Sequence, residues 1–551
     1  MYTTDLIVLF IFALIVFVTG MSFSSSGKSM KTFFAAGGAV PWWINGLSLF
    51  MSFFSAGTFV VWGSIAYSQG AVSLSIQWMM CLGGLLVGTF IAARWQKTDS
   101  LTVAEYLTKR LGYKTQRIYT WLFLFISVFT TGAFLYPVAK IVEVSTGIDI
   151  SLSIIILGLL ITIYTATGGL WAVIVTDVLQ FVVLSAAVMI VVPLSFKAAG
   201  GFSNFLHTAP EGFFSLTNNE YTGSFLIAFG LYNLVFIGGN WAYVQRYTSV
   251  SAPKEAKKVG WLFGALYTVS PIIWMLPPML YRIIQPELGG LADEGAYLLI
   301  CKKVMPAGLL GLVLGGMVFA TASSVNTTLN ISAGVLTNDL YKHFVPDASD
   351  KKLMRFARIS TGFFGLFTIF VALLVPKMGG IVEVVLSVAA ITGGAMYLPP
   401  VWSLFSKRQT ALSIISATVI SLLINAYFKF LAPTQLGITL SRELEMGLGV
   451  GLPVLILLIW ELWFLLKGEN QISSYNNEQT ITVNLSSQPV EGETEEQKTE
   501  NKEGIKKIGM GTLAIGVLMF LLGIYAWEVY AIITGMILSG LSSWIIFRQR
   551  T

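Results

Sequence analysis

The sequence predicts an all-α protein that crosses a membrane many times. Of its 551 residues, 55% are hydrophobic and 11% are charged, whereas about a quarter of the residues in soluble domains are charged. Apolar runs close to the roughly 20 residues that span a bilayer follow one another along the chain. A transmembrane β-barrel would show short segments of alternating polarity instead. We therefore expect a polytopic helical protein of a cell membrane.

The apolar runs predict about fifteen helices. They lie near residues 4–21, 41–67, 71–93, 115–144, 150–168, 172–197, 223–245, 258–284, 306–340, 354–376, 380–403, 409–430, 443–466, 508–526 and 528–547. The first run lacks a basic start and a small-residue cleavage pattern, so we expect it to be retained rather than removed as a signal peptide.

The positions of Lys and Arg predict the orientation of these helices. With the N-terminus outside, the inner loops and inner ends hold 26 of the 34 Lys and Arg residues. Inner loops of membrane proteins carry such an excess. We therefore expect the N-terminus outside and the C-terminus inside. The net charge of +6 follows from this topology and requires no nucleic-acid partner.

Composition divides the chain into five parts. Residues 468–507 are rich in Asn, Gln, Ser, Thr and Glu. Because such a segment cannot bury enough apolar area to fold alone, we expect a disordered acidic cytoplasmic linker. A regulatory tail is the alternative. Trp527 and Glu528 predict a tight turn in the last helical pair, because a glutamate is costly inside a span. The parts are an extra helix with the first cytoplasmic loop (1–40), a core (41–403), two peripheral helices (404–467), the linker (468–507) and a helical hairpin (508–551).

The sequence gives no sign of catalytic chemistry. Two cysteines and two histidines do not predict a disulfide framework or a metal centre of the Cys/His type. No constellation of His, Cys or paired carboxylates occurs at membrane depth, so we expect neither an enzyme nor an organic cofactor.

A polar cluster within one apolar run is the strongest functional signal. Seven of the eleven residues from 320 to 330 have polar side chains. Hydrocarbon offers no hydrogen-bond partners, so such side chains must face protein, water or a ligand. Hydroxyl and carbonyl oxygens suit a small hard cation such as Na⁺. The alternative is that these Ser and Thr hydroxyls bond back to their own helix.

Two runs, five helices apart, are interrupted at membrane depth. Residues 52–58 contain Ser, Gly and Thr, and the later run contains Asn233 and then Gly238, Gly239 and Asn240. Paired interruptions in corresponding halves indicate the binding site of a transporter. Close helix packing at small residues is the alternative. Asp177 is a third candidate, because a carboxylate near membrane depth usually has a cation or other partner; snorkelling to water is its alternative.

Several motifs together resemble the sodium:solute symporter family. Residues 164–173 (YTATGGLWAV), followed by Thr176, Asp177 and Gln180, resemble the family signature. Three further segments resemble the family: the Trp pair 42–43, the Gln245-Arg246 pair with residues 254–258, and residues 320–341. The resemblance therefore covers roughly residues 5–465. It implies a five-plus-five inverted repeat, like that of the bacterial leucine transporter, with the core in the second to eleventh helices.

The resemblance also implies positions for the coupling ion Na⁺. One Na⁺ would be held by backbone carbonyls of the broken first core helix and by oxygens of the eighth core helix. These positions are Met51 and Phe54, then Ala320, Ser323 and Ser324. Some members hold a second Na⁺, for which the matching positions are Asp177, Asn326 and Thr327. Asn326 replaces a small hydroxyl residue there, which leaves the second ion open.

The implied substrate positions are less well matched. Asn233 matches an asparagine of the sugar carriers, and Phe236 stands where they have a tyrosine gate. Thr130 lies near the position of the arginine that binds the carboxylate in sialic acid carriers. The expected pocket is uncharged and hydrogen-bonding, formed by Ser55, Thr58, Gln77, Asn233 and Tyr267.

The implied activity is Na⁺-coupled symport of a small neutral solute by alternating access, with a sugar or polyol favoured. The partners would be the solute, Na⁺ and the lipid bilayer, and we expect a functional monomer. The alternatives are an amino-acid or monocarboxylate symporter, or a solute sensor of the same fold.

Overall fold

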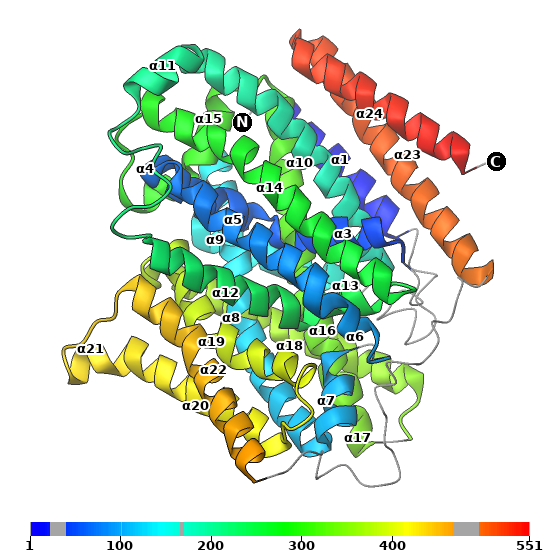
Figure 1. Ribbon diagram of the computed structural model, residues 1–551. Helices are drawn as coiled ribbons and strands as arrows, with labels where there is room; N and C mark the ends of the chain where they lie inside the picture. Colours follow the sequence, from blue (N-terminus) through cyan, green and yellow to red (C-terminus); the bar gives the residue numbers. More distant parts are fainter. Residues whose placement is uncertain are drawn as a thin grey trace.

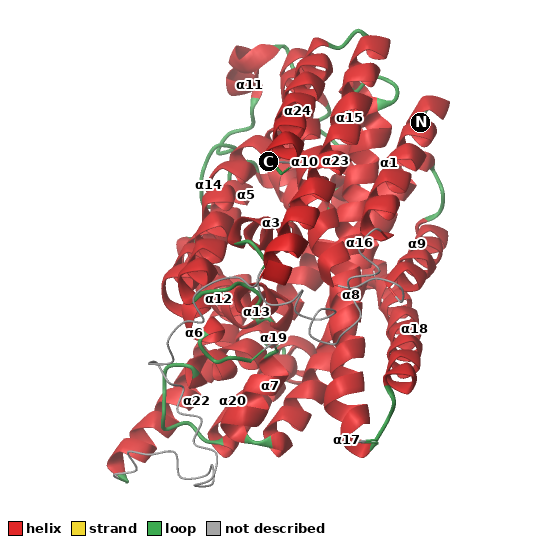
Figure 2. Cartoon of the chain, turned by 90° about the vertical axis from the view of Figure 1, so that its right-hand side faces the viewer, coloured by secondary structure: helices red, strands yellow, loops and turns green. Residues whose placement is uncertain are grey.

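Helices form wherever the sequence contains an apolar run (Figure 1). The structure is a computed structural model that describes residues 2–21, 40–100, 102–165, 170–345, 347–467 and 495–549. Within these ranges there is no strand, and the helices are joined by short loops (Figure 2). Each of the fifteen expected segments overlaps a helix. By length and composition, eleven described helices could cross a membrane, or thirteen if each bent pair is one span.

The first half of the core contains five consecutive helical segments, of which the first is broken. They are α3 (Trp42–Phe53) with η2 (Thr58–Trp62) and α4 (Gly63–Gln69); α5 (Val72–Leu86) with η3 (Val87–Ile91) and α6 (Ala92–Gln96); α8 (Tyr113–Thr146); α9 (Ile150–Thr165); and α10 (Leu170–Ala198).

The second half repeats this order, again starting with a broken span. Its elements are α12 (Gly223–Gly239) with α13 (Trp241–Thr248); α14 (Pro253–Ile284); α16 (Leu309–Val335) with η5 (Leu336–Tyr341); α18 (Asp350–Leu374); and α19 (Ile381–Ser403). Shorter elements connect or flank the spans: α7 (Val103–Leu111), α11 (Gly201–Thr208), η4 (Gly290–Gly295), α15 (Ala296–Val304), α17 (Lys342–Phe344) and η6 (Val375–Met378).

Corresponding helices of the two halves make corresponding contacts. Helix α5 packs on α14, α8 on α16, and α9 on α18. Two further contacts also have a counterpart in the other half: α3 packs on α14 as α12 packs on α5, and α10 packs on α3 as α19 packs on α12. Exchanging the two halves leaves these contacts unchanged, as a five-plus-five repeat requires.

Both predicted interruptions are present as sharp bends. The helix axes change direction by 54° between α3 and the segment 58–69, and by 57° between α12 and α13. Phe54 leaves the helical conformation (φ −89°, ψ 95°), as does Asn240 (φ −63°, ψ 131°). The expectation of two broken spans at these residues is confirmed.

Peripheral helices surround the core. Helix α1 (Thr3–Met21) packs on α16, and its buried Asp5 carboxylate accepts hydrogen bonds from the backbone N–H groups of Gly308 (2.6 Å) and Gly311 (3.2 Å). Helices α20 (Ala411–Ala426) and α22 (Arg442–Leu466), joined through η7 (Tyr427–Leu431) and α21 (Ala432–Gln435), cover α19.

The C-terminal hairpin consists of α23 (Glu495–Ala526) and α24 (Val529–Arg548), which pack against each other and against α10. The predicted turn at Trp527 and Glu528 is confirmed. Helix α23 begins before residue 508, so residues 495–507, expected in the linker, are helical. Ile505 and Ile508 explain this extension, because they pack against buried side chains of α3 and α10. The rest of the expected linker, 468–494, lies outside the described residues.

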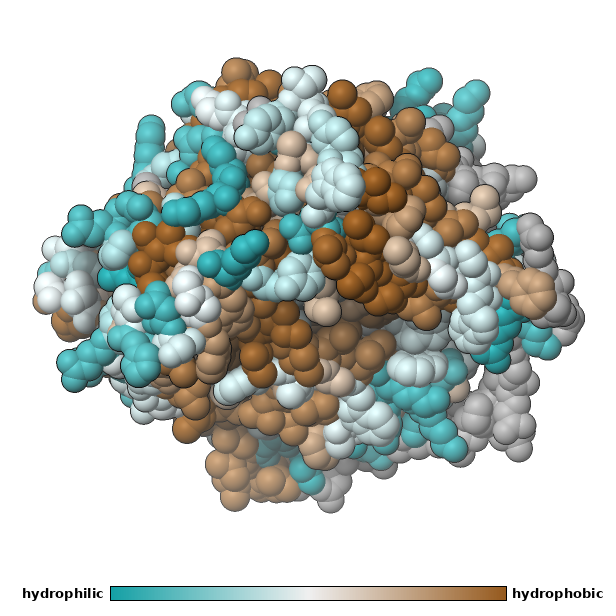
Figure 3. All heavy atoms as spheres, turned by 90° about the horizontal axis from the view of Figure 1, so that it is seen from above, coloured by the Kyte–Doolittle hydropathy of each residue, from teal (hydrophilic) through white to brown (hydrophobic). Residues whose placement is uncertain are grey.

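Surface polarity differs between the flanks and the end of the bundle. Large apolar side chains are exposed along the flanks of peripheral helices, including Leu466 and Phe547. The end at which α11 and α15 lie carries hydrophilic side chains interspersed with hydrophobic ones (Figure 3). Flanks of this kind suit lipid, and the end face suits the membrane–water boundary.

Candidate functional site

The first break diverts four consecutive backbone N–H groups. In an uninterrupted α-helix, those of residues 55–58 would bond to the carbonyls of Met51, Ser52, Phe53 and Phe54. Here they bond elsewhere: Ser55 N to Thr58 Oγ1 (3.2 Å), Ala56 N to Thr321 Oγ1 (2.6 Å), Gly57 N to Ser55 Oγ (3.2 Å) and Thr58 N to Ser55 O (2.9 Å). The Phe53 carbonyl accepts the Thr58 hydroxyl instead (3.0 Å). The carbonyls of Met51, Ser52 and Phe54 have lost their helical donors.

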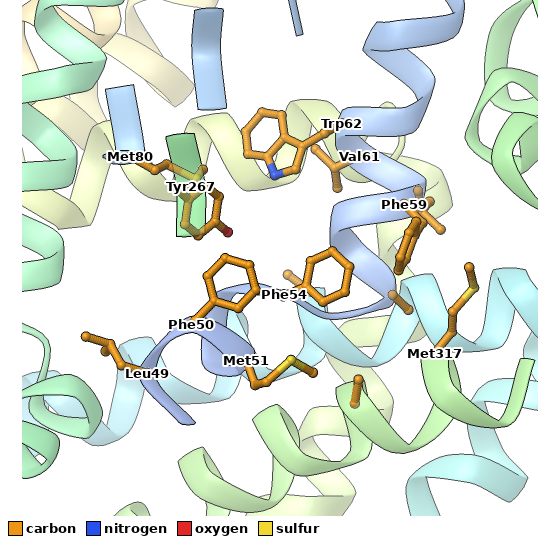
Figure 4. Close-up of a cluster of buried hydrophobic side chains, with 14 of the residues drawn as sticks. Leu49, Phe50, Met51, Phe54, Phe59, Val61, Trp62, Met80, Tyr267 and Met317 are labelled. Atoms are coloured by element: carbon orange, nitrogen blue, oxygen red, sulfur yellow. The ribbon is translucent and has the colours of Figure 1, made fainter. Parts of the chain in front are cut away.

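Helix α16 faces this break. Figure 4 shows Met51 and Phe54 at the break and Met317 on α16. Ala320 and Ser324 are buried on α16, and the Ser324 hydroxyl donates a long hydrogen bond to the Ala320 carbonyl (3.4 Å). A hydroxyl that donates its hydrogen in this way keeps lone pairs for another partner. The side chain of Ser323 lies outside the described part of the structure.

This arrangement suits a small cation. Freed carbonyls lie at the C-terminal end of α3, where the helix dipole is negative. Hydroxyl and carbonyl oxygens are the ligands that hard cations prefer. Within the described residues, no group of three or more His, Cys, Asp or Glu side chains could hold a metal ion.

The second break has two of its freed carbonyls occupied by side-chain donors. The buried Trp95 indole donates to the Gly238 carbonyl (2.6 Å), and the Tyr247 hydroxyl donates to the Ile237 carbonyl (3.1 Å). The Asn240 side chain caps α13 by accepting from Ala242 N (3.0 Å). Protein donors therefore satisfy most of this break, which distinguishes it from the first.

Asp177 lies against the N-terminal half of the broken span rather than in open space. The Ser48 hydroxyl donates to Asp177 Oδ2 (2.6 Å) and accepts from Arg246 Nε (3.2 Å). All three side chains are buried. Nearby, Asn45 Nδ2 donates to Ser249 Oγ (3.1 Å) and Val40 N donates to Ser249 O (3.0 Å). These bonds join α3 to α10 and to the end of α13.

The other two residues expected at a second ion site lie on α16. Asn326 and Thr327 are buried, and Asn326 lines a separate cavity of about 410 Å³ with Thr176 and Gln180 of α10 and apolar residues of α1 and α9. Asp177 does not line that cavity. The second ion therefore stays a prediction.

A cavity of about 130 Å³ lies between the two breaks. Helices α8 and α19 complete its wall. Four of the expected substrate and gate residues line it: Ser55, Thr58, Asn233 and Phe236. No Asp, Glu, Lys or Arg is among its described lining residues. Seven of the lining residues are aromatic: Phe53, Trp62, Phe134, Phe229, Tyr232, Phe236 and Tyr243.

The polar lining groups differ in what they can offer a ligand. The Thr58 hydroxyl is engaged as donor and acceptor within the break, whereas Ser55 Oγ only accepts, from Gly57 N. Asn233 Nδ2 donates to the Phe229 carbonyl (2.8 Å), while its buried Oδ1 has no hydrogen-bond partner among the described residues. A ligand with a donor group could therefore bond to Asn233.

Gln77 and Tyr267 do not line this cavity. The Gln77 amide donates to the Ser73 carbonyl of its own helix (3.1 Å). Tyr267 packs against Phe50 (ring centroids 5.0 Å apart) and Phe263 (4.8 Å). Its buried hydroxyl has no hydrogen-bond partner within the described ranges.

Phe236 lies in an aromatic cluster at one end of the cavity. Its ring centroid is 5.8 Å from Phe53, 5.3 Å from Tyr232, 5.5 Å from Tyr243 and 5.4 Å from Tyr397. Phe53 and Tyr243 are 4.7 Å apart. These rings come from both broken spans and α19, and four of them (Phe53, Tyr232, Phe236 and Tyr243) line the cavity.

Sequence reasoning missed three contributors to this site. Thr321 was part of the polar cluster, but nothing in the sequence distinguished it from its neighbours. Ser48 and Trp95 lie a full turn or more from any recognisable interruption. Their roles depend on which helices pack together, and that information is absent from local sequence patterns.

Two broken spans around an uncharged cavity, with freed carbonyls at one break, define a secondary transporter of the inverted-repeat class. The sodium:solute symporter family model matches residues 33–420. The chain belongs to the sodium:solute symporter family, and it is a sodium-coupled solute symporter of a membrane rather than an enzyme.

Relatives and one solved structure agree with this assignment. The sodium/glucose cotransporter of Vibrio parahaemolyticus is 29% identical over 469 residues, 78% of this chain and 85% of the relative. Sodium/glucose cotransporter 1 of Mus musculus is 28% identical over 401 residues, 64% of this chain and 60% of the relative; the chain thus spans about three fifths of that animal protein. The structure of a Na⁺-coupled sialic acid symporter matches with a TM-score of 0.71 and 22% identity, covering 84% of this chain and 98% of that chain, which shows the shared fold.

Proposed function

We propose that the protein carries a small neutral organic solute, preferably a sugar or polyol, into the cell together with Na⁺. The observation that carries this proposal is the uncharged cavity beside the first break, where carbonyls have lost their helical donors. Solute and ion would then bind to the same broken span, so that each can favour the state that binds the other.

The proposed Na⁺ ligands are the carbonyls of Met51, Phe54 and Ala320 and the hydroxyls of Ser323 and Ser324. Na⁺ joins α3 to α16 and stabilises the state in which the solute can enter. Release follows when the break separates from α16 toward the sodium-poor cytoplasm. The membrane potential assists by about 2.3 kcal/mol per charge per 100 mV. A second Na⁺ at Asp177, Asn326 and Thr327 is a further proposal.

The proposed topology places fifteen helices across the membrane, with the N-terminus outside and the C-terminus inside. The wall of the cavity then comes from the middle and outer parts of α3–η2, α12 and α19. At the inner ends, α3 is bonded to α13 through Ser249 and through Ser48 and Arg246. Those bonds favour an outward-facing state as the one described here.

The lining of the cavity supports a neutral solute. Thr130, near the position of the arginine in the sialic acid carriers, lines the cavity and its hydroxyl bonds to its own helix. A buried anion without a cationic partner is strongly unfavourable. Aromatic rings would pack against the apolar face of a sugar ring, while Asn233 Oδ1 and Ser55 Oγ would bond to hydroxyl groups.

Uptake into proteoliposomes tests the proposal. Labelled sugars, polyols, sugar acids and amino acids are offered with an inward Na⁺ gradient or an equal K⁺ gradient. The proposal predicts accumulation of a neutral solute with Na⁺ only, and loss of that uptake in Asn233→Leu. Accumulation of only an anion, or equal uptake in K⁺, would contradict it.

A further inference from the structure

One hydrogen bond joins the first break to the helix that faces it. Of the four diverted N–H groups, those of Ser55, Gly57 and Thr58 bond within the break itself. The N–H of Ala56 bonds to Thr321 Oγ1 of α16 at 2.6 Å. Among the described residues, no other hydrogen bond connects α16 to residues 54–58, and both Ala56 and Thr321 are fully buried.

Thr321 lies on the face of α16 that also carries the proposed ion ligands. Ala320 and Ser324 are four residues apart, and Thr321 and Ser324 are three apart, so all three share one side of the helix. The Thr321 hydroxyl is itself held in place, because it donates to the Met317 carbonyl one turn earlier (3.1 Å). Its oxygen therefore faces the break as a fixed acceptor.

We propose that Thr321 is a positioning residue for the Na⁺ site. By holding the Ala56 N–H, it keeps that group away from the Ser52 carbonyl and keeps the break against α16. The freed carbonyls of Met51 and Phe54 are then held near Ala320 and Ser324 before the ion arrives. Ligands held in the required geometry bind more tightly, because less conformational freedom is lost on binding. This inference rests on the proposed Na⁺ site.

Valine has the shape of threonine without the hydroxyl, so Thr321→Val removes the acceptor with little change in packing. The buried Ala56 N–H would then lack a partner or bond back to Ser52, which would restore part of the helix. Thr321→Ser keeps the acceptor. Thr328→Val is the matched control, because Thr328 lies on the same helix and its hydroxyl bonds only to the Ser324 carbonyl (3.1 Å).

The test measures Na⁺ affinity of the purified full-length protein from thermal stabilisation during a Na⁺ titration at constant ionic strength with K⁺. We expect Thr321→Val to lower Na⁺ affinity about tenfold, the usual scale for a lost buried hydrogen bond. Thr321→Ser and Thr328→Val should stay within about twofold of the wild type. Affinity for the transported solute at saturating Na⁺ should be unchanged in Thr321→Val, which a general loss of structure would not allow.

Three results would overturn the inference. The first two are a Na⁺ affinity of Thr321→Val that equals that of the wild type, or one that exceeds it. The third is a Na⁺ affinity of Thr328→Val that falls as far below the wild type as that of Thr321→Val. Thr321→Ala also removes the acceptor, so its Na⁺ affinity must be lowered as in Thr321→Val. A wild type that Na⁺ does not stabilise more than K⁺ would overturn the proposed site as well as this inference, so the two failures are distinguishable.

Discussion

The Ser48 hydroxyl donates a hydrogen bond of 2.6 Å to the Asp177 carboxylate, and the same oxygen accepts one from Arg246. A single hydroxyl on the broken span thus bonds to a buried acid on α10 and a buried base on α13. Any movement of the N-terminal half of α3 away from these helices must break both bonds. The three residues therefore oppose opening at this end of the bundle, which is the inner side in the proposed topology.

Ser48→Ala should weaken this closure. Both charged groups would lose a buried partner, and leaving a buried group unsatisfied costs about 1–3 kcal/mol. We expect faster Na⁺ leak through proteoliposomes in the absence of solute. Ser68→Ala is the control, since Ser68 Oγ bonds only to the Ser64 carbonyl in the same broken span. A leak equal to that of the wild type would show that Ser48 does not restrain the inner side.

Asp177→Asn separates two possible roles of the carboxylate. Asparagine can still accept from Ser48, but it removes the negative charge that the Ser48 hydroxyl links to the buried Arg246 guanidinium, and a buried charge that loses its partner destabilises the fold. We expect a lower melting temperature and a lower Hill coefficient for Na⁺ in solute uptake. An unchanged Hill coefficient with a lowered melting temperature would show that Asp177 is structural and that the second ion does not use it.

Trp95→Phe should destabilise the second break without affecting the ion. It removes the donor to the Gly238 carbonyl, and we expect a loss of about 1–3 kcal/mol in stability, seen as a lower melting temperature. Na⁺ affinity should stay unchanged. Trp78→Phe is the control, because its indole bonds to the Thr268 carbonyl at an exposed position. Equal melting temperatures for the two variants would contradict the role of Trp95.

Glu294 should make stability depend on pH. Burial raises the pKa of its carboxyl above the ordinary 4.5, while hydrogen bonds from Ile381 N and the Tyr136 hydroxyl lower it in part. A group with a raised folded-state pKa binds its proton more tightly when folded, so its stability contribution is lost as the pH rises through that pKa. Relative to Glu294→Gln, the wild type should lose stability as the pH rises above 4.5. Parallel melting curves of the two proteins over this range would contradict this prediction.

Apolar runs and small polar interruptions were sufficient to predict the helices, both breaks and the turn at Trp527, because these depend on local composition. The start of α23 could not be predicted, since Ile505 and Ile508 acquire their partners on α3 and α10 only in the folded protein. The same dependence on tertiary packing explains which predicted site residues line the cavity. Asn233 and Ser55, predicted from the interrupted runs and the family resemblance, line the cavity, whereas Gln77 and Tyr267 do not, because the helix face that turns toward the cavity depends on packing.

The most direct test of sodium coupling at the first break is the thermal stability of the wild type and Ser324→Ala in Na⁺ and in K⁺. A ligand that binds the folded state raises its stability by mass action. We expect Na⁺, but not K⁺, to raise the melting temperature of the wild type, and Ser324→Ala to lose most of that difference. Equal stabilisation of the wild type by both ions, or an unchanged Na⁺ effect in Ser324→Ala, would contradict the site.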